Sequence, residues 1–545
     1  MRDAERAASE RLFLPRDQAG TPRRNQSYSA FARGFSRGDY VDGVDDERYD
    51  LDEDDGEVAY ATLVQDELER TAPVHESEGT SSVCRVTFNF INTVVGSGVL
   101  AIPFAIQQAG FAFGLLMAAF VGSTSDYTIR MLVNTGLREG VRNYEELMDK
   151  LFGFGGWAII STLLFMYDAG AMQSYLIILG HVSGDVIYEV TTDLLGLQAE
   201  IWQDRALMRR VSIVVISLTL ILPLCLMRDV SRLEHASAFS VVTVMLVILV
   251  VVGAAVAGDN CPLRHTDPST CPDTDAPWFT LIGENPSAAY GILAFAFVSH
   301  DTSFLFYNSL RNASQARWKK VSRLALGGSI VICLTLAIPG YISFRETVKQ
   351  NILDNFAPND LKIVIVRVLF MITMSFTYPI CFFICRHILN EMIYRWKNRD
   401  KERVPGTPAG ISIKDISQRR HLTLTFVLFT ASILIALAVD DLGLVMAVTG
   451  NISAVSISFV LPPLCAMRSR WEENISACRC IEAERGRALS DPTPSVPLLP
   501  ASGGICPRCY PENVGYDASF IEYIAVLTFG CFTLVFCTLQ TLGIM

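Results

Sequence analysis

The first long apolar stretch of the chain contains residues that could bind an ion and a carboxylate. It spans residues 86–125 without a charged side chain, and it holds Asn92, Gly96-Ser97-Gly98 and Pro103. Glycine relaxes the steric limits on the backbone and proline lacks an N–H group, so a helix here is predicted to unwind near the triplet. Freed amide groups at the start of the next half-helix would bind a carboxylate. The Asn92 oxygen and freed carbonyl groups would bind Na⁺, a hard cation that prefers oxygen ligands.

The same residues could either let two helices pack closely or bind a solute. Small residues such as those of the Gly96-Ser97-Gly98 triplet also let two helices approach each other. Close packing alone does not require the neighbouring Asn92 and Pro103. Backbone groups that leave the helical pattern inside a bilayer have no water to satisfy them, and transporters with discontinuous helices use such groups to bind solutes. The stretch therefore indicates solute transport rather than simple anchoring.

Three ionisable side chains lie inside other apolar stretches, where a charge is costly and is usually paired or functional. His300 and Asp301 are candidates for binding a coupling proton, because an imidazole titrates near neutral pH. The alternative for His300 is a neutral ring that is hydrogen-bonded to a carbonyl group. Asp168 could pair with a cation such as Arg367, line an aqueous cavity, or contact a substrate. His181 and Asp185, near the outer end of the same stretch as Asp168, are predicted to lie on a solvated face rather than to form a relay.

These side chains require a framework of membrane-spanning helices, which the composition supports. Half of the 545 residues are apolar, and charged residues make up only 19%. Soluble proteins contain about 25% charged residues. The residue alternation of a β-barrel is absent, so the spans are predicted to be helices. The apolar runs predict eleven spans, at residues 84–107, 111–133, 157–187, 211–227, 236–257, 287–309, 322–344, 362–386, 421–439, 442–467 and 521–545.

The charge distribution predicts the orientation of the chain. The net charge is −11, and the first 83 residues alone hold 20 acidic and 10 basic side chains. Such a segment is typical of a solvated, disordered arm, which could also have cytoplasmic partners. Basic residues gather in alternate loops, around 311–323, 386–403 and 468–485. Loops rich in lysine and arginine stay in the cytoplasm, so the amino terminus is predicted to be cytoplasmic and the carboxy terminus outside or lumenal.

The chain is thus predicted to have four parts and one disulfide. The parts are a disordered acidic cytoplasmic tail, a ten-helix core, a flexible cytoplasmic insert and an eleventh membrane helix, at residues 1–83, 84–467, 468–519 and 520–545. The loop before the sixth span contains Cys261 and Cys271. These cysteines are predicted to form a disulfide, because their loop lies on the outer side of the membrane.

Three strings of residues resemble the sodium-coupled neutral amino acid transporters, which belong to the amino acid/auxin permease group. The most specific is residues 88–100, Phe-Asn-Phe-Ile-Asn-Thr-Val-Val-Gly-Ser-Gly-Val-Leu, which resembles the first membrane helix of that family. Residues 295–300 and 375–379 are similar to its sixth and eighth helices, and the strings occur in the expected order. The resemblance covers the chain from about residue 82 to residue 464.

The resemblance implies a fold and a set of ligands. The fold would be an all-α polytopic membrane protein with eleven helices, in which two inverted repeats of five helices form a core of the leucine-transporter type. Asn92 and Thr377 would be Na⁺ ligands, with Ser375 as a second hydroxyl candidate. The carboxylate and the ammonium group of the substrate would be bound by the backbones of two triplets, Gly96, Ser97 and Gly98, and Phe297, Val298 and Ser299.

The expected function is secondary active transport of small neutral amino acids, coupled to Na⁺ by alternating access, with no further cofactor and no nucleic acid partner. Sequence motifs of nucleotide-binding loops, zinc proteases and serine hydrolases are absent, so no enzymatic activity is predicted. Two alternatives stay open. One is a proton-coupled permease of an organelle membrane, and the other is an amino acid sensor that signals through its cytoplasmic tail. The bilayer could be the plasma membrane or a vacuolar or lysosomal membrane.

Overall fold

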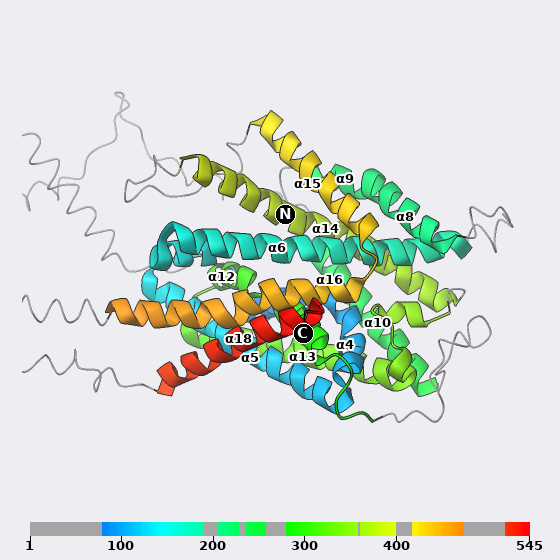
Figure 1. Ribbon diagram of the computed structural model, residues 1–545, viewed down its shortest axis with the longest axis horizontal. Helices are drawn as coiled ribbons and strands as arrows, with labels where there is room; N and C mark the ends of the chain where they lie inside the picture. Colours follow the sequence, from blue (N-terminus) through cyan, green and yellow to red (C-terminus); the bar gives the residue numbers. More distant parts are fainter. Residues whose placement is uncertain are drawn as a thin grey trace, which may run out of the picture. The chain divides into compact units, whose positions relative to one another are not determined.

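The computed structural model of the chain is shown in Figure 1. It describes residues 79–189, 204–227, 236–257, 279–357, 360–398, 417–473 and 518–544. Every described residue belongs to the unit Pro73–Met545. Most of the predicted acidic tail, most of the predicted insert and the predicted disulfide between Cys261 and Cys271 lie outside the described residues.

The described residues form helices, apart from one isolated β-bridge between Ser81 and Leu310. Elements η1, η6 and η7 are 3-10 helices, whereas η3, η9 and η10 are π-helical. The elements in chain order are α3 (Val83–Val94), η1 (Ser97–Ala101), α4 (Ile102–Ala109), α5 (Phe111–Glu139), α6 (Tyr144–Glu189), α8 (Arg205–Ile216), η3 (Ser217–Ile221), α9 (Leu222–Cys225), α10 (Ala236–Ala257), α11 (Pro286–Phe297), α12 (His300–Ser309), α13 (Gln315–Phe344), η6 (Arg345–Thr347), η7 (Ile352–Asn355), α14 (Leu361–Asn398), α15 (Gln418–Ala438), α16 (Leu442–Thr449), η9 (Gly450–Ala454), η10 (Ser456–Val460) and α18 (Ala518–Thr541).

Most of the predicted spans meet the requirements of a membrane-crossing helix. Among the described residues, 9 helices are long and apolar enough, and the bent pair Val83–Val94 and Gly98–Ala109 would make a tenth. The 29-residue α5 is not among them, and the polar run Ser123-Thr124-Ser125-Asp126 at its centre explains why. All eleven predicted spans fall on helical elements. The bent pair and the 9 helices account for ten of them, and the crossing at α5 stays a prediction.

Local sequence signals define where several helices begin. Asn285 accepts a hydrogen bond from the Ala288 N–H group at the start of α11, where Pro286 occupies the first helical position. Asp441 likewise accepts from the Leu444 N–H group at the start of α16. Such side chains satisfy donors that have no partner within the helix. Asn285 and Asp441 therefore fix where α11 and α16 begin.

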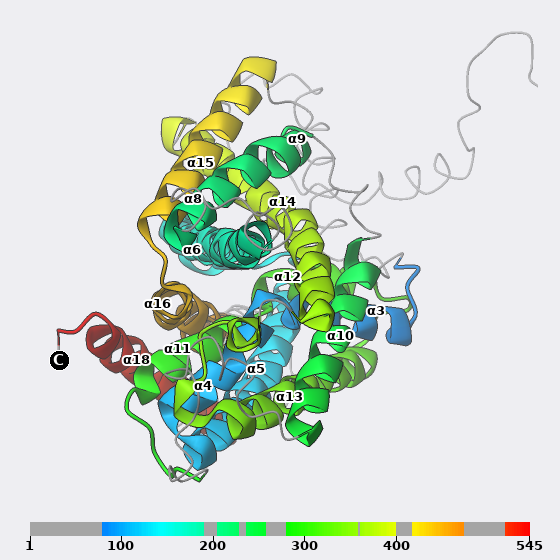
Figure 2. The same cartoon turned by 90° about the vertical axis from the view of Figure 1, so that its right-hand side faces the viewer.

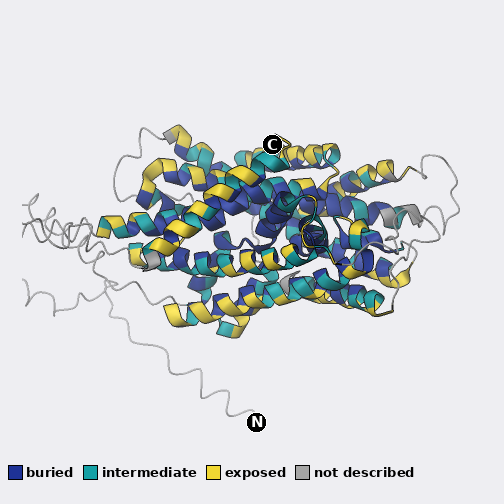
Figure 3. Cartoon of the chain, turned by 60° about the horizontal axis from the view of Figure 1, so that its bottom comes forward, coloured by how far each residue is buried: buried dark blue, intermediate teal, exposed yellow. Residues whose placement is uncertain are grey.

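Apolar side chains cover the outside of the helical body as well as its core. Exposed (yellow) positions run along the outward faces of several helices in Figure 3. Large apolar side chains are among the exposed residues, and Leu116, Leu249 and Val331 are 70%, 67% and 64% exposed. A soluble monomer rarely exposes so many large apolar side chains together. Lipid chains in a bilayer would cover this surface.

The helices form two groups with α16 between them (Figure 2). One group contains α6, α8, α14 and α15, and the main neighbours of α6 are α14 and α8. The other contains α4, α5, α11 and α13, in which α11 packs against α4 and α13 against α5. Helix α16 contacts α11 in one group and α6 in the other. The residues predicted to bind substrate and ion come from elements of both groups.

Several helices extend beyond the predicted spans, α14 for example to Asn398 rather than to residue 386. Helix α6 begins at Tyr144 rather than near residue 157, and it continues through a kink at Gly153, which has a φ of 65°. The helical span that starts with α16 continues to Glu473 rather than to residue 467. Hydropathy finds only the part of a helix that lies in lipid, so it does not detect polar extensions that continue the same backbone pattern.

Candidate functional site

The first broken helix is interrupted where the sequence predicts it. Helix α3 ends at Val94, and Gly96 adopts a φ of −92° and a ψ of −143° before η1 begins at Ser97. The helix axes on the two sides of the break differ by 53°. The glycine allows a backbone conformation that a helix cannot continue through, and Pro103 sits in the first turn of α4, where its missing N–H is harmless.

A second break separates α11 from α12 without the help of glycine or proline. Val298 has a ψ of 132° and Ser299 has a φ of −159°, so the helix stops after Phe297 and restarts at His300. The Ser299 hydroxyl oxygen is buried and has no hydrogen-bond partner among the described residues. Polar side chains at this point were the only sequence signal for the break. It places the carbonyl groups of residues 297–299 outside a regular helix.

The two breaks lie next to each other. A Cβ atom added to Gly98 would lie only 2.9 Å from the Ala296 Cβ atom, so the two backbones approach more closely than larger residues would allow. Element η1 also contacts α6, and an added Cβ atom on Gly96 would lie 3.7 Å from the Tyr175 hydroxyl oxygen. The structure thus brings the predicted carboxylate and ammonium triplets together and adds Tyr175, which sequence reasoning missed.

Asp168 of α6 is the most deeply buried of the candidate acidic residues. Its side chain is 2% exposed, and its Oδ2 atom has no hydrogen-bond partner among the described residues. Arg367, one of the partners considered from the sequence, donates to the Leu353 carbonyl oxygen at 3.0 Å. The acidic groups of Asp301 and Glu145 are close enough to interact electrostatically with Asp168, and the thiol of Cys381 lies beside its carboxylate. Asp168 therefore carries an acidic group into the interior without a matching basic residue.

The candidate Na⁺ ligands have oxygen lone pairs that could bind an ion. The Asn92 Oδ1 atom is buried without a hydrogen-bond partner in the described part of the chain. The hydroxyl groups of Thr377 and Ser375 donate to the carbonyl groups of Thr373 and Met371 at 2.9 and 2.8 Å, which leaves their oxygen lone pairs available. Asn92 is on α3, which packs mainly against α13 and α10, whereas both hydroxyl groups are on α14. Their meeting around one ion stays a prediction.

Both ring nitrogens of His300 lie within hydrogen-bond distance of a hydroxyl group. Its Nε2 atom lies 2.9 Å from the Thr128 hydroxyl oxygen of α5, and its Nδ1 atom lies 3.1 Å from the Ser458 hydroxyl oxygen of η10. The ring itself is completely buried. These contacts fit the alternative of a hydrogen-bonded ring, although the partners are hydroxyl groups rather than a carbonyl group. The π-helical turns around Ser458 often mark functional sites, but a sequence does not reveal them.

Comparison with known proteins gives the chain its family. A family model described as "Transmembrane amino acid transporter protein" matches residues 79–483. The chain belongs to this family. Two similar proteins carry the name "Putative sodium-coupled neutral amino acid transporter 11". The one from Rattus norvegicus is 31% identical over 395 residues, which cover 72% of this chain and 79% of that protein. The one from Mus musculus is 30% identical over 410 residues, which cover 74% and 83%.

More distant similarity extends to a yeast protein and a solved structure. "Vacuolar amino acid transporter 2" of Saccharomyces cerevisiae is 26% identical over 429 residues, which cover 77% of this chain and 83% of that protein. The crystal structure of MhsT in complex with L-phenylalanine aligns with a TM-score of 0.47 and 12% identity, over 85% of this chain and 99% of that chain. Family membership makes this chain a multi-pass membrane protein of amino acid transport.

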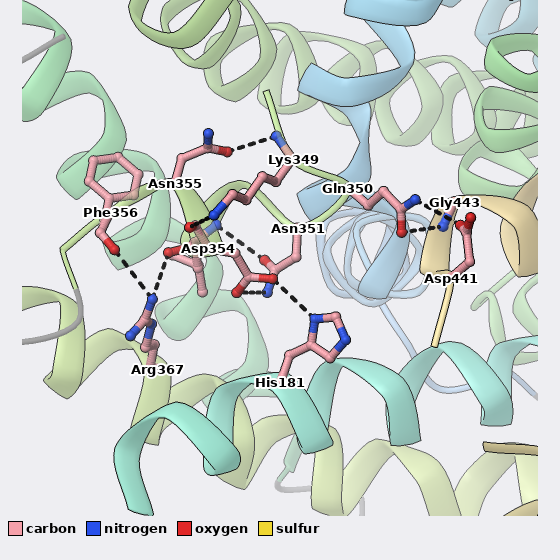
Figure 4. A network of polar contacts seen from close by, with 11 residues as sticks. His181, Lys349, Gln350, Asn351, Asp354, Asn355, Phe356, Arg367, Asp441 and Gly443 are labelled. Atoms are coloured by element: carbon pink, nitrogen blue, oxygen red, sulfur yellow. Dashed lines mark hydrogen bonds and ion pairs between the residues drawn. The ribbon is translucent and has the colours of Figure 1, made fainter. Parts of the chain in front are cut away.

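This member of the transmembrane amino acid transporter family also has a polar network at one end of its helices (Figure 4). His181 of α6 lies 3.2 Å from the Asp354 carboxylate of η7, and Asn351 donates to the same carboxylate at 3.0 Å. Gln350 donates to Asp441 at 2.7 Å, next to the start of α16. The prediction that His181 lies on a solvated face is wrong, because η7 folds back over it.

The network surrounds an acidic group and covers the first break. Burial by itself raises the pKa of Asp354, but the hydrogen bond and charge of His181, followed by the charges of Arg367 and Arg209, lower the pKa below its ordinary value overall. Element η7, which carries Asp354, also contacts η1. We call the end of the helical body that carries this network the η7 side. On the η7 side, the segment that contacts η1 is held by His181 of α6 and Arg367 of α14.

Proposed function

We propose that this chain is a secondary active transporter of small neutral amino acids that is coupled to Na⁺ and works by alternating access. The observation that carries the proposal is the pair of helix breaks that meet at Gly98 and Ala296. Amide groups at η1 suit the carboxylate of an amino acid, and carbonyl groups at residues 297–299 suit its ammonium group. The names of the rat and mouse relatives agree with this substrate and this ion.

In this mechanism Na⁺ binds near the buried Asn92 oxygen, with Thr377 or Ser375 supplying a hydroxyl oxygen. The ion holds the broken helix in the conformation that presents its amides to the substrate. Asp168 of α6 is buried in the helical interior. Binding of both solutes favours closure of one side and opening of the other. No covalent step is involved.

The fold that we propose counts α5 as a span and has eleven in all. The two breaks then fall in the first and the sixth span, which are the first helices of two sets of five. An inverted repeat of five plus five helices, with α18 as the extra helix, accounts for that spacing. The basic loops lie at the helix ends opposite the η7 side. Because such loops stay in the cytoplasm, the η7 side would face the outside or an organelle lumen. The host membrane would be the plasma membrane or a vacuolar or lysosomal membrane.

Counterflow in proteoliposomes tests the proposal directly. Purified protein is reconstituted with each unlabelled amino acid inside, and the entry of the same radiolabelled amino acid is followed with and without Na⁺. We expect labelled small neutral amino acids to accumulate transiently, and faster with Na⁺. Correctly folded protein that exchanges none of the amino acids would refute transport.

Replacing Asn92 with alanine should weaken Na⁺ coupling. The variant loses a buried oxygen that accepts no hydrogen bond in the described part of the chain. We expect the Na⁺ concentration for half-maximal counterflow to rise about tenfold, which corresponds to about 1.4 kcal/mol. Thr93→Ala is the matched control, because the exposed Thr93 hydroxyl donates only to the Asn89 carbonyl group of its own helix. Equal Na⁺ dependence in the Asn92→Ala variant and the wild type would remove Asn92 from the ion site.

The second candidate is a proton-coupled permease of an organelle membrane. Two observations favour it: the similarity to the vacuolar transporter of yeast, and the acidic side chain of Asp168, which is buried in the helical interior. Wild-type counterflow and accumulation that do not respond to Na⁺ at fixed pH, but respond to a pH gradient, would select this candidate over the first.

A further inference from the structure

An open groove lies on the outside of the helical body, between α8 and α15. The two helices contact each other, and both pack on α6 (Figure 2). The groove has a volume of about 560 Å³, which is within the roughly 300–1,000 Å³ of small-molecule sites. Its walls are formed by one charged and five apolar residues, which are Arg210, Val211, Val214 and Val215 of α8 and Leu437 and Ala438 of α15. A ligand that fits this groove is largely apolar and carries a group that binds arginine.

The charged end of the groove lies at the η7 side. A Cβ atom added to Gly184 of α6, three residues after His181, would lie 2.8 Å from the Arg209 Cγ atom of α8. The first turns of α8 are therefore level with the polar network of the η7 side. Helix α15 ends at Ala438, three residues before Asp441 of the same network. The two walls of the groove thus meet near the helix ends, where a membrane helix leaves the lipid chains and reaches the lipid head groups.

The positive charge of Arg210 has no counter-charge in the described part of the chain. Its side chain is exposed, and it forms no hydrogen bond or ion pair with another described residue. Asp204, just before α8, accepts hydrogen bonds from backbone N–H groups of that helix. Asp440, just after α15, is exposed and pairs with no described cation. Arg210 therefore presents an uncompensated charge at the edge of an apolar groove.

The usual rule for membrane orientation does not explain this arginine. In the topology that we propose, basic residues gather on the cytoplasmic side, opposite the η7 side. Helix α8 nevertheless holds Arg205, Arg209 and Arg210 among its first six residues. Arg209 packs against α6 and so belongs to the interior, whereas Arg210 lies on the lipid-facing groove. Binding of an anion at the membrane surface accounts for a charge at this position.

We propose that the groove binds one anionic phospholipid from the leaflet on the η7 side, with its phosphate on Arg210 and an acyl chain along the valines of α8. This inference goes beyond the proposed transport function and does not depend on it. A guanidinium group matches the geometry of phosphate oxygens and binds them through two parallel N–H groups. An arginine near a helix end also extends its head group to the membrane interface, where the phosphates lie.

The spacing of the groove residues along α8 fits a phospholipid. Val214 follows Arg210 by four residues, which corresponds to about 6 Å along a helix. The polar interface on each side of a bilayer is about 5–8 Å thick, so the acyl chains begin at about that depth below the phosphates. The apolar wall therefore starts where a lipid becomes apolar. A lipid held between α8 and α15 contacts both helices, so its binding stabilises their packing.

Native mass spectrometry of the full-length protein in detergent tests the proposal, because it counts the lipids that stay bound. The protein is titrated with phosphatidylglycerol and, in parallel, with phosphatidylcholine that has the same acyl chains. We expect the wild type to retain a single phosphatidylglycerol about fivefold or more tightly than phosphatidylcholine, whose choline group already neutralises its phosphate. Phosphatidylglycerol should also raise the temperature of thermal unfolding more than phosphatidylcholine does.

Variants separate the charge from the groove. Arg210→Gln should bind phosphatidylglycerol at least about fivefold more weakly, because it loses the charge-assisted hydrogen bonds, and Arg210→Lys should recover part of the binding. Val214→Trp should weaken binding as much with the arginine in place, because the larger side chain fills the groove. Should Val214→Trp not fold, Val215→Trp decides instead, because Val215 is 50% exposed. The control is Arg323→Gln, which removes an exposed arginine near the start of α13 and should leave binding unchanged.

Four results would overturn the lipid site. The first is equal retention of the two lipids by the wild type. The second is an equal loss of binding in Arg210→Gln and Arg323→Gln, which would indicate general attraction between charges. The third is a groove-filling variant that binds as the wild type does. The fourth is a wild-type dimer that the groove-filling variant separates, since a second copy would then occupy the groove. If the lipid binds as expected but no amino acid is exchanged in counterflow, the lipid site stands and the proposed function fails.

Discussion

Replacing Gly450 with alanine should prevent the helical body from packing as it does here. A Cβ atom added to Gly450 would lie 1.8 Å from the Gly291 carbonyl oxygen, and real Cβ atoms essentially never approach another atom within 3.0 Å. The obstacle is the backbone of α11, which cannot rotate away as a side chain would. We expect a loss of about 3 kcal/mol or more of stability, at the upper end for overpacked sites. Thermal unfolding in detergent measures this loss.

The Gly450 position matters for function because α11 leads into the second break. Gly291 of α11 is equally tight, since its added Cβ atom would lie 2.4 Å from the Ala447 carbonyl oxygen of α16. Separating α11 from α16 would displace residues 297–299 from η1, so we expect the fraction that still folds to lose counterflow.

The control for this substitution is Gly253→Ala on α10. An added Cβ atom there meets nothing within 4 Å, and alanine favours a helix interior over glycine by roughly 0.5–1 kcal/mol. Gly253→Ala should therefore unfold at the wild-type temperature or slightly above it. A Gly450→Ala variant as stable as Gly253→Ala would contradict the close contact between α11 and η9.

The sequence predicts features that depend on neighbouring residues. The first break follows from glycine and proline near Asn92, because these residue types change the local backbone directly. The spans follow from local hydropathy. Val298 and Ser299, by contrast, are ordinary residues in a non-helical conformation. Their break depends on the surrounding packing, and only polar side chains nearby hinted at it.

Contacts between distant parts of the chain could not be predicted in the same way. Thr128 and Ser458 lie 172 and 158 residues from His300 in sequence, and His181 lies 173 residues from Asp354. Each of these residues is unremarkable in its local sequence. Their roles appear only when the fold sets α6 against η7 and α12 against α5 and η10, so a single sequence could not show which polar residues are paired and which, like Asp168, are not.

Replacing Asp354 with alanine should open the η7 side. Asp354 is held by His181 of α6 and by Asn351, and the segment that carries it covers η1. Removing the carboxylate leaves the polar side chains of His181 and Asn351 without their partner, and two buried polar groups left unsatisfied cost together about 3 kcal/mol. That energy corresponds to roughly a hundredfold change in an equilibrium. We expect amide hydrogen exchange in residues 348–357 and 97–101 to accelerate by about that factor.

The pH dependence of this closure follows from the lowered pKa of Asp354. Burial alone would raise that pKa, but His181, Arg367 and Arg209 lower it overall. A lowered pKa means that the contribution of Asp354 to stability is fully present above the ordinary carboxyl pKa of about 4, and that it is lost only as the pH falls through the lowered value. Between neutral pH and about pH 5, protonation of Asp354 should therefore not accelerate amide hydrogen exchange at the η7 side of the wild type.

The control is Asp440→Ala, which removes an exposed carboxylate beside Asp441 at the same end of the molecule. It should leave hydrogen exchange in both segments unchanged, since a solvated charge contributes little. If Asp354→Ala and Asp440→Ala behave alike, η7 is held by its backbone and apolar contacts rather than by the His181 pair. If only Asp354→Ala accelerates exchange, the contact between α6 and η7 controls access to the first break from this side.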